Sequence, residues 1–132
     1  MNILLTGGLG FIGSTIILKL IEKNYKPIII DNLSTSKKVS IERIESITKK
    51  KLDFYNCDIR NLPDLENIFN KIQVDHVIHL AGLKSVSESM SFPTRYFNNN
   101  ILGSINLLEM MQRHNIKKII FSSSATVYGH PN

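Results

Sequence analysis

A glycine-rich segment near the start of the chain has the residue types and spacing of a phosphate-binding turn. Gly8, Gly10 and Gly13 form a GxGxxG string, and Gly7, Gly10 and Gly13 form the wider GxxGxxG string. Glycine permits the positive φ of a tight turn, a middle glycine leaves room for a pyrophosphate, and a last glycine lets helix and strand approach closely. The free N–H groups of a following helix would face the phosphates. The string therefore predicts dinucleotide binding, with an ordinary glycine-rich loop as the alternative.

An acidic residue follows the second apolar run at the distance that a dinucleotide site requires. Asp31 lies 18 residues after Gly13 and directly after the apolar run 27–30. A carboxylate at this place accepts hydrogen bonds from an adenosine ribose and disfavours a 2′-phosphate. The spacing predicts NAD as the cofactor, although Lys37 and Lys38 leave NADP open. The alternative is that Asp31 only begins a loop.

The elements that would position these residues alternate between strands and helices. Short apolar runs predict strands at residues 2–6, 27–30, 52–56, 76–80 and 118–122. Helical spacing of apolar residues predicts helices at residues 12–23, 41–47, 61–72 and 93–114. The last helix is inferred from the spacing of Phe97, Ile101, Ile105, Leu108 and Met111. This alternation requires crossover connections, so the fold class is predicted as α/β: a Rossmann-like, doubly wound parallel sheet in one domain over residues 1–132, with ligands at the carboxyl ends of its strands.

Composition and charge exclude several classes of function. The 132 residues are 42% hydrophobic and 20% charged, with a net charge of +5. The lysines are scattered and not interleaved with aromatic residues, so no nucleic-acid partner is predicted. No apolar run approaches the roughly 18 residues of a membrane span. The single cysteine, Cys57, is interpreted as a packed thiol in a reducing, cytoplasmic compartment. His76 and His79 are interpreted as hydrogen-bonded strand residues, and no metal site is predicted.

Longer strings close the later strands and are more specific than the glycine turn. They are NCDIR at residues 56–60, HLAGLKSVSES at 79–89, NNN at 98–100 and SSSATVYG at 122–129. Together with the TGGLGFIG turn, they give the chain a sequence that resembles the extended short-chain dehydrogenase/reductase family, and within it the UDP-glucose 4-epimerases. The resemblance covers the whole chain, and the AGLKSVSES stretch distinguishes it most clearly from related sugar-nucleotide dehydratases.

The resemblance implies a set of residues around an NAD cofactor and a sugar substrate. Those expected to contact the cofactor are Gly7, Gly10, Phe11, Ile12 and Gly13 at the pyrophosphate, Asp31, Asn32, Leu33, Ser34, Thr35 and Ser36 around the adenosine ribose, Asp58 and Ile59 at the adenine, and Leu80, Ala81, Gly82, Leu83, Lys84 and Asn99 along the remainder. Ser124 is expected to be the active-site hydroxyl that bonds the sugar oxygen undergoing oxidation, with Thr126 close to the substrate.

Each of the polar residues in this set also has a purely structural interpretation. Asp58 would cap the turn after the third strand, and Lys84 would be a solvated surface lysine. The asparagines 98–100 would be a weak helix start, and the serines 122–124 a polar strand end. Their common position at strand ends favours the functional interpretation.

The proton-transfer pair that the resemblance implies is missing from the chain. Epimerases of this kind move a hydride from sugar C4 to NAD and back, through a 4-keto sugar, while the tyrosine of a YxxxK pair acts as base. The residues four positions after the tyrosines are Ile29, Ile59, Asn100 and Asn132, and none is a lysine.

The sequence is therefore expected to be the amino-terminal, NAD-binding portion of an epimerase, inactive by itself and without the UDP-sugar-binding region. The full-length protein would act on UDP-glucose and UDP-galactose as a homodimer, and the fifth strand would be an unprotected sheet edge prone to self-association. The alternatives are another nucleotide-sugar enzyme, such as a dehydratase or a UDP-glucuronate or UDP-N-acetylhexosamine epimerase, or a stand-alone NAD-binding module.

Overall fold

A parallel sheet forms the centre of the computed structural model, which describes residues 1–129 apart from the side chains of residues 125 and 126. The sheet has five strands in the order β3-β2-β1-β4-β5, and all neighbouring pairs are parallel. The strands are β1 (Asn2–Thr6), β2 (Lys26–Asp31), β3 (Asp53–Asn56), β4 (His76–His79) and β5 (Ile119–Phe121). The order reverses between β1 and β4, where a doubly wound sheet forms its ligand crevice. The predicted fold class is confirmed.

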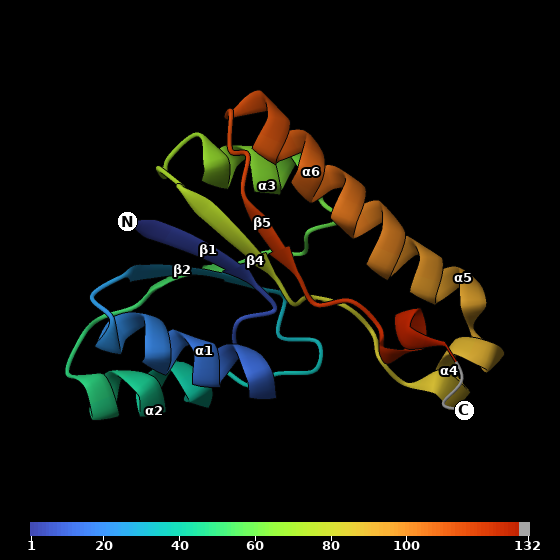
Figure 1. Ribbon diagram of the computed structural model, residues 1–132, viewed down its shortest axis with the longest axis horizontal. Helices are drawn as coiled ribbons and strands as arrows, with labels where there is room; N and C mark the ends of the chain where they lie inside the picture. The colour runs from blue at the N-terminus through green and yellow to red at the C-terminus, as the bar shows by residue number, and fades with distance from the viewer. Residues whose placement is uncertain (130–132) are drawn as a thin grey trace.

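Helices cover both faces of this sheet (Figure 1). The helical elements are α1 (Phe11–Glu22), α2 (Val39–Thr48), α3 (Leu62–Phe69), α4 (Val86–Ser91), α5 (Pro93–Tyr96), the π-helix η1 (Phe97–Leu102), α6 (Gly103–Arg113) and the 3-10 helix η2 (Ala125–Tyr128). Helices α1 and α2 lie on one face, and α3 and α6 on the other. Because side chains alternate along a strand, β1 serves both layers: Leu4 packs with the α3 and α6 cluster, whereas Ile3 and Leu5 pack with the α1 and α2 cluster.

The predicted helix at residues 93–114 exists as the consecutive elements α5, η1 and α6, but most of the positions that indicated it face outward. Phe97, Ile101, Ile105 and Leu108 are 50–61% exposed. The buried residues of α6 include Leu107, Met110 and Met111. The helix carries apolar side chains on two faces, and periodicity does not indicate which of the two packs on the sheet. Of the five residues used for the prediction, only Met111 is in the core.

Strand β5 lies at one edge of the sheet, as the sequence predicted. Its residues Ile119, Ile120 and Phe121 are 37%, 66% and 57% exposed. An edge strand with exposed apolar side chains can pair with another chain, so self-association remains a prediction. Among residues 1–129, no helix combines the length and apolar character that crossing a bilayer requires.

Candidate functional site

A cavity of about 300 Å³ lies at the carboxyl ends of β1 to β4. Every residue predicted to contact the cofactor lines this cavity except Leu33. Leu33 has a positive φ of 59° and packs instead against the core cluster of α1 and α2. The cavity is also lined by Ile30, Cys57 and Ser122, which the sequence analysis did not assign to the site. The strand ends thus converge on one site because parallel strands all end at the same edge.

The glycines of the first turn meet two different requirements. Gly7 has a φ of +67°, and a Cβ on it would lie 2.7 Å from the backbone nitrogen of Ala81. A Cβ on Gly13 would lie 2.5 Å from the carbonyl oxygen of Gly8. A Cβ on Gly10 would meet only the Gly7 oxygen, at 3.4 Å, and Gly10 lines the cavity. The fold therefore requires glycine at 7 and 13, whereas position 10 leaves room at the start of α1 that a ligand can fill.

The start of α1 suits an anion. Gly10 is the N-cap residue and provides no side-chain cap, and the first turn contains no acidic residue. The first N–H groups of a helix have no acceptor within the helix, and the helix dipole places partial positive charge there. A pyrophosphate seated over Gly10 would satisfy these groups, so the residues present fit a dinucleotide.

Asp31 is a buried carboxylate that organises two loops at once. Its Oδ2 accepts from the N–H of Leu9 at 3.0 Å, inside the glycine turn. Its Oδ1 accepts from the N–H of Leu33 at 2.9 Å and from the hydroxyl of Ser36 at 2.8 Å. A carboxylate has about four acceptor positions, so Oδ2 retains one for a ligand hydroxyl. Asp31 thus begins the loop and also lines the cavity, and its contact with an adenosine ribose stays a prediction.

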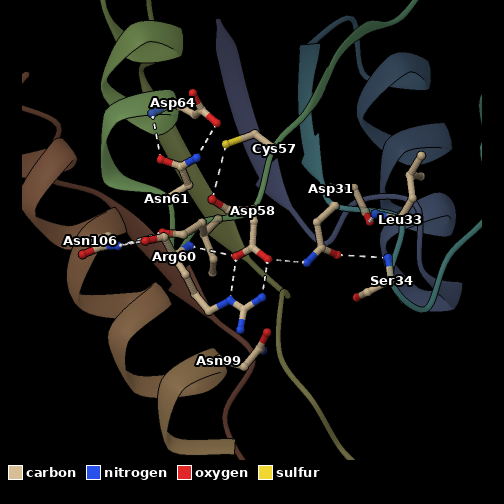
Figure 2. A network of polar contacts seen from close by, with 12 residues as sticks. Asp31, Leu33, Ser34, Cys57, Asp58, Arg60, Asn61, Asp64, Asn99 and Asn106 are labelled. Carbon is tan, nitrogen blue, oxygen red and sulfur yellow. Dashed lines mark hydrogen bonds and ion pairs between the residues drawn. The ribbon is translucent and has the colours of Figure 1, made fainter. Parts of the chain in front are cut away.

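Asp58 is held by a guanidinium fork at the end of β3 (Figure 2). Its Oδ1 accepts from Nε of Arg60 at 2.9 Å, and its Oδ2 accepts from Nη2 at 2.7 Å. Oδ1 also accepts from the backbone N–H of Arg60, which is the turn-capping contact. The hydrogen bonds from Arg60 hold the pKa of Asp58 well below its usual range, despite partial burial. The carboxylate at the cavity wall is therefore an ionised acceptor.

The loop after β4 is positioned by an asparagine that the sequence analysis did not single out. The side chain of Asn100 accepts from the N–H of Leu83 at 2.8 Å and donates to the Leu83 carbonyl at 3.0 Å. Asn99, the predicted residue, lines the cavity and donates to Oδ1 of Asn100 at 2.9 Å. The NNN string indicated that polar side chains are needed in this helix, but it did not indicate which asparagine contacts the loop and which lines the cavity. The π-helical turn η1 places Asn99 and Asn100 beside the loop and the cavity.

A directional chain of hydrogen bonds links α6 to β4, β1 and the loop after β4. At its centre lies His79, which is 2% exposed. The hydroxyl of Ser104 donates to the carbonyl of Asn100, so Nε2 of His79 must be the donor to Ser104, at 2.8 Å. Nδ1 of His79 is then an acceptor for the hydroxyl of Thr6, whose oxygen receives the N–H of Ala81. Burial, with a smaller contribution from Lys84, lowers the pKa of His79 to about 4. The interpretation of His79 as a hydrogen-bonded core residue is confirmed.

We expect this buried histidine to make the fold sensitive to mild acid. The unfolded chain takes up a proton on His79 below about pH 6.5, whereas the native state resists it down to about pH 4. The unfolding free energy should therefore fall as pH falls through this window, by about 2 kcal/mol between pH 7 and pH 5. Urea unfolding at several pH values measures this. His79→Gln should flatten the profile; a slope equal to that of the wild-type protein would contradict the assignment.

Asn106 is a second residue that sequence reasoning missed. It is 6% exposed on α6, and its Nδ2 donates to the carbonyls of Ile59 and Arg60, both at 3.0 Å. A Cβ on Gly103, one turn earlier, would lie 2.7 Å from the Ile59 side chain. Helix α6 thus holds the backbone of the segment that carries Asp58. The sequence feature that could have indicated its role is the presence of an asparagine on an apolar face of the helix.

Replacing Asn106 with leucine should lower the unfolding free energy by about 2 kcal/mol or more. Leucine has nearly the same size but leaves the buried carbonyl of Ile59 and the part-buried carbonyl of Arg60 without their donor, and each unsatisfied buried group costs about 1–3 kcal/mol. Chemical denaturation measures the change. Asn67→Leu, at an exposed position within α3, provides the control. A loss below about 0.5 kcal/mol in Asn106→Leu would show that these bonds are replaceable.

The remaining predicted residues lie near β5. Ser124 follows the strand, is exposed and does not line the cavity, whereas Ser122 does. Thr126 lies in η2, and its side chain is outside the described part of the structure. Cys57 is buried at the cavity wall, and desolvation raises its pKa to about 11, so it is a poor nucleophile at neutral pH. Over the described residues, no group of three or more His, Cys, Asp and Glu residues is placed to hold a metal ion.

Comparisons with known proteins give a family for the chain and a set of enzymes to which it is similar. The family model for GDP-mannose 4,6-dehydratase matches residues 4–132. The chain is 51% identical over 131 residues to a UDP-glucose 4-epimerase of Dictyostelium discoideum, covering 99% of this chain and 38% of the relative. It is 50% identical to the UDP-glucose 4-epimerase of Yersinia enterocolitica, with 99% and 39% coverage.

Solved structures of UDP-glucose 4-epimerases are also similar to the chain. The UDP-glucose 4-epimerase of Bifidobacterium longum, in complex with NAD+ and UDP, superimposes with a TM-score of 0.96 at 46% identity, over 99% of this chain and 39% of that one. The enzyme of Thermus thermophilus, in complex with NAD, gives 0.86 at 34% identity, over 94% and 38%. The chain therefore spans about two-fifths of the length of these relatives.

Proposed function

The chain belongs to the GDP-mannose 4,6-dehydratase family, and on that premise we propose that it is the NAD-binding portion of a UDP-glucose 4-epimerase. The observation that carries the proposal is the cavity at the strand ends, lined by the glycine turn, Asp31 and Asp58. The similarity to UDP-glucose 4-epimerases, two of them solved with NAD, supports it. Residues 1–132 then make up one incomplete domain of that enzyme.

Residues at the ends of different strands would bind different parts of the cofactor. Gly10 at the start of α1 would hold the pyrophosphate, and the free position on Asp31 would accept from the adenosine ribose. Asp58 and Ile59 would hold the adenine, with the carboxylate accepting from its exocyclic amine. Residues 80–84 and Ser122 would line the nicotinamide end. When bound, its ring supplies the hydride acceptor for sugar C4.

The charge and packing around Asp31 favour NAD over NADP. A 2′-phosphate would lie against a carboxylate whose other acceptor positions are filled by Leu9, Leu33 and Ser36. Repulsion between two anions at this distance is costly where water is partly excluded. We expect NADP to bind at least about tenfold more weakly.

The full-length protein would interconvert UDP-glucose and UDP-galactose in the cytoplasm as a homodimer. Ser124 is its catalytic hydroxyl, which orients the sugar oxygen, and Thr126 lies close to the substrate. The 132-residue chain contains no tyrosine with a lysine four positions later. Without that base it binds NAD but does not remove the sugar's hydroxyl proton.

Two measurements on the purified chain test this proposal. Calorimetric titration should give saturable 1:1 binding of NAD and weaker binding of NADP, and a coupled assay with UDP-galactose and NAD should give no UDP-glucose. A folded chain that does not bind NAD would contradict the cofactor assignment. Measurable turnover would contradict the assignment of the chain as an inactive portion.

A further inference from the structure

Arg60 lies behind Asp58 and does not itself line the cavity. It contributes three of the donors to the carboxylate: its backbone N–H and Nε to Oδ1, and Nη2 to Oδ2. A fork of two parallel N–H groups fixes the plane of a carboxylate as well as its charge. Asp58 is therefore the cavity residue through whose hydrogen bonds the Arg60 side chain would act on a ligand.

The fourth donor to the carboxylate comes from a different loop. Nδ2 of Asn32 donates to Oδ2 of Asp58 at 2.9 Å, while Oδ1 of Asn32 accepts from the N–H of Ser34 at 3.1 Å (Figure 2). All four acceptor positions of Asp58 are thus filled. Asn32 is the one neutral side-chain donor among them, and it lines the cavity. A ligand N–H can take this position, while the charge-assisted fork of Arg60 stays in place.

The fork has a rigid support. The carbonyl of Arg60 accepts from the buried side chain of Asn106, which ties the residue to α6. The side chain of Arg60 is 42% exposed and that of Asp58 is 25% exposed, so the pair lies at the rim of the cavity with its backbone anchored below.

We propose that Arg60 is a positioning residue for base recognition: it orients the Asp58 carboxylate so that Oδ2 accepts from a 6-amino purine and rejects a 6-oxo purine. This inference rests on the proposed function, because it takes the adenine of NAD as the group that faces Asp58. A 6-amino group replaces the Asn32 amide as donor, whereas a 6-oxo group turns an oxygen toward an ionised oxygen. Without the fork, the carboxylate can rotate away and both bases meet water instead.

The test compares the affinities of the chain for NAD and for nicotinamide hypoxanthine dinucleotide. Wild type should prefer NAD by about tenfold or more, the scale of one hydrogen bond to a charged group. Arg60→Met keeps the aliphatic stem and should reduce the preference to about twofold or less. Arg60→Lys keeps the charge without the fork and should also reduce it. The control is Arg113→Met, since Arg113 is similarly exposed and pairs with Glu66 and Glu109 away from the cavity.

The ratio of the two affinities distinguishes a positioning role from a general loss of structure, because a destabilised site would bind both dinucleotides more weakly to the same extent. A preference unchanged in Arg60→Met overturns the inference, as does an equal loss in Arg113→Met. If Arg60→Met does not fold, an unchanged preference in Arg60→Lys overturns it. A wild-type chain that binds both dinucleotides equally refutes this inference alone, whereas one that binds neither refutes the proposed function with it.

Discussion

Replacing Gly10 with alanine should weaken NAD binding by about 10- to 100-fold, the effect of forcing one methyl group into a filled site. Among the described residues, the added Cβ would have only the Gly7 oxygen nearby, at 3.4 Å, and the backbone φ of −70° suits alanine. The unfolding free energy should stay within about 1 kcal/mol of wild type, because reduced entropy of the unfolded chain offsets a poorer N-cap. Calorimetry and urea unfolding measure the two quantities.

Thr15→Ala provides a matched control on the same helix. Thr15 is exposed, does not line the cavity and uses its hydroxyl only on the Phe11 carbonyl. Its NAD affinity should equal that of wild type. If Gly10→Ala binds NAD with wild-type affinity, the pyrophosphate does not lie over the start of α1, and the proposed position of the cofactor is wrong.

Replacing Gly7 with alanine should have the opposite signature, with a loss of stability of at least about 3 kcal/mol. An alanine at φ +67° is strained, and its Cβ would overlap the backbone of Ala81, with 2.7 Å to the nitrogen and 2.8 Å to Cα. Relief requires β1 and β4 to separate where their ends meet the cavity. Urea unfolding followed by circular dichroism measures the change, since the chain has no tryptophan.

Gly129→Ala isolates the strain from the overlap. Gly129 also has a positive φ, +77°, but a Cβ on it would have no atom of the described residues within 4 Å. Its cost should be only the roughly 1–2 kcal/mol of an alanine in this conformation. Equal losses in the two variants would mean that the contact with Ala81 adds nothing.

The order of the strands and helices along the chain could be predicted from the sequence because it follows from local rules, whereas most residues that line the site were predicted from the resemblance to a known family. Glycine spacing and Asp31 located the first crossover, and strings such as NCDIR located the later strand ends. Parallel strands then bring their carboxyl ends together whatever the details of packing. The resemblance to a known family assigned roles such as that of Asp58, which the spacing alone left open.

The parts that could not be predicted depend on tertiary contacts. Leu33 packs against the core, and its backbone takes a positive φ. Leucine rarely adopts this conformation, so its presence in the sequence does not predict it. The side chains of Phe97 and Ile105 face outward because the other apolar face of their helix packs on the sheet, and the sequence does not show which face does so. The partners of Asn106 are 46 and 47 residues away in the chain, so no local pattern indicates them.

The central claim, that this chain binds NAD at the carboxyl ends of its strands, is tested most directly by an NMR titration of the ¹⁵N-labelled chain. With NAD, the amide signals of residues 7–13, 31–36, 58–60 and 80–84 should shift and saturate together. Those at the opposite end of the sheet, residues 24–26 and 50–53, should not move. A folded chain whose spectrum is unchanged by NAD, or changed only at that opposite end, would contradict the account.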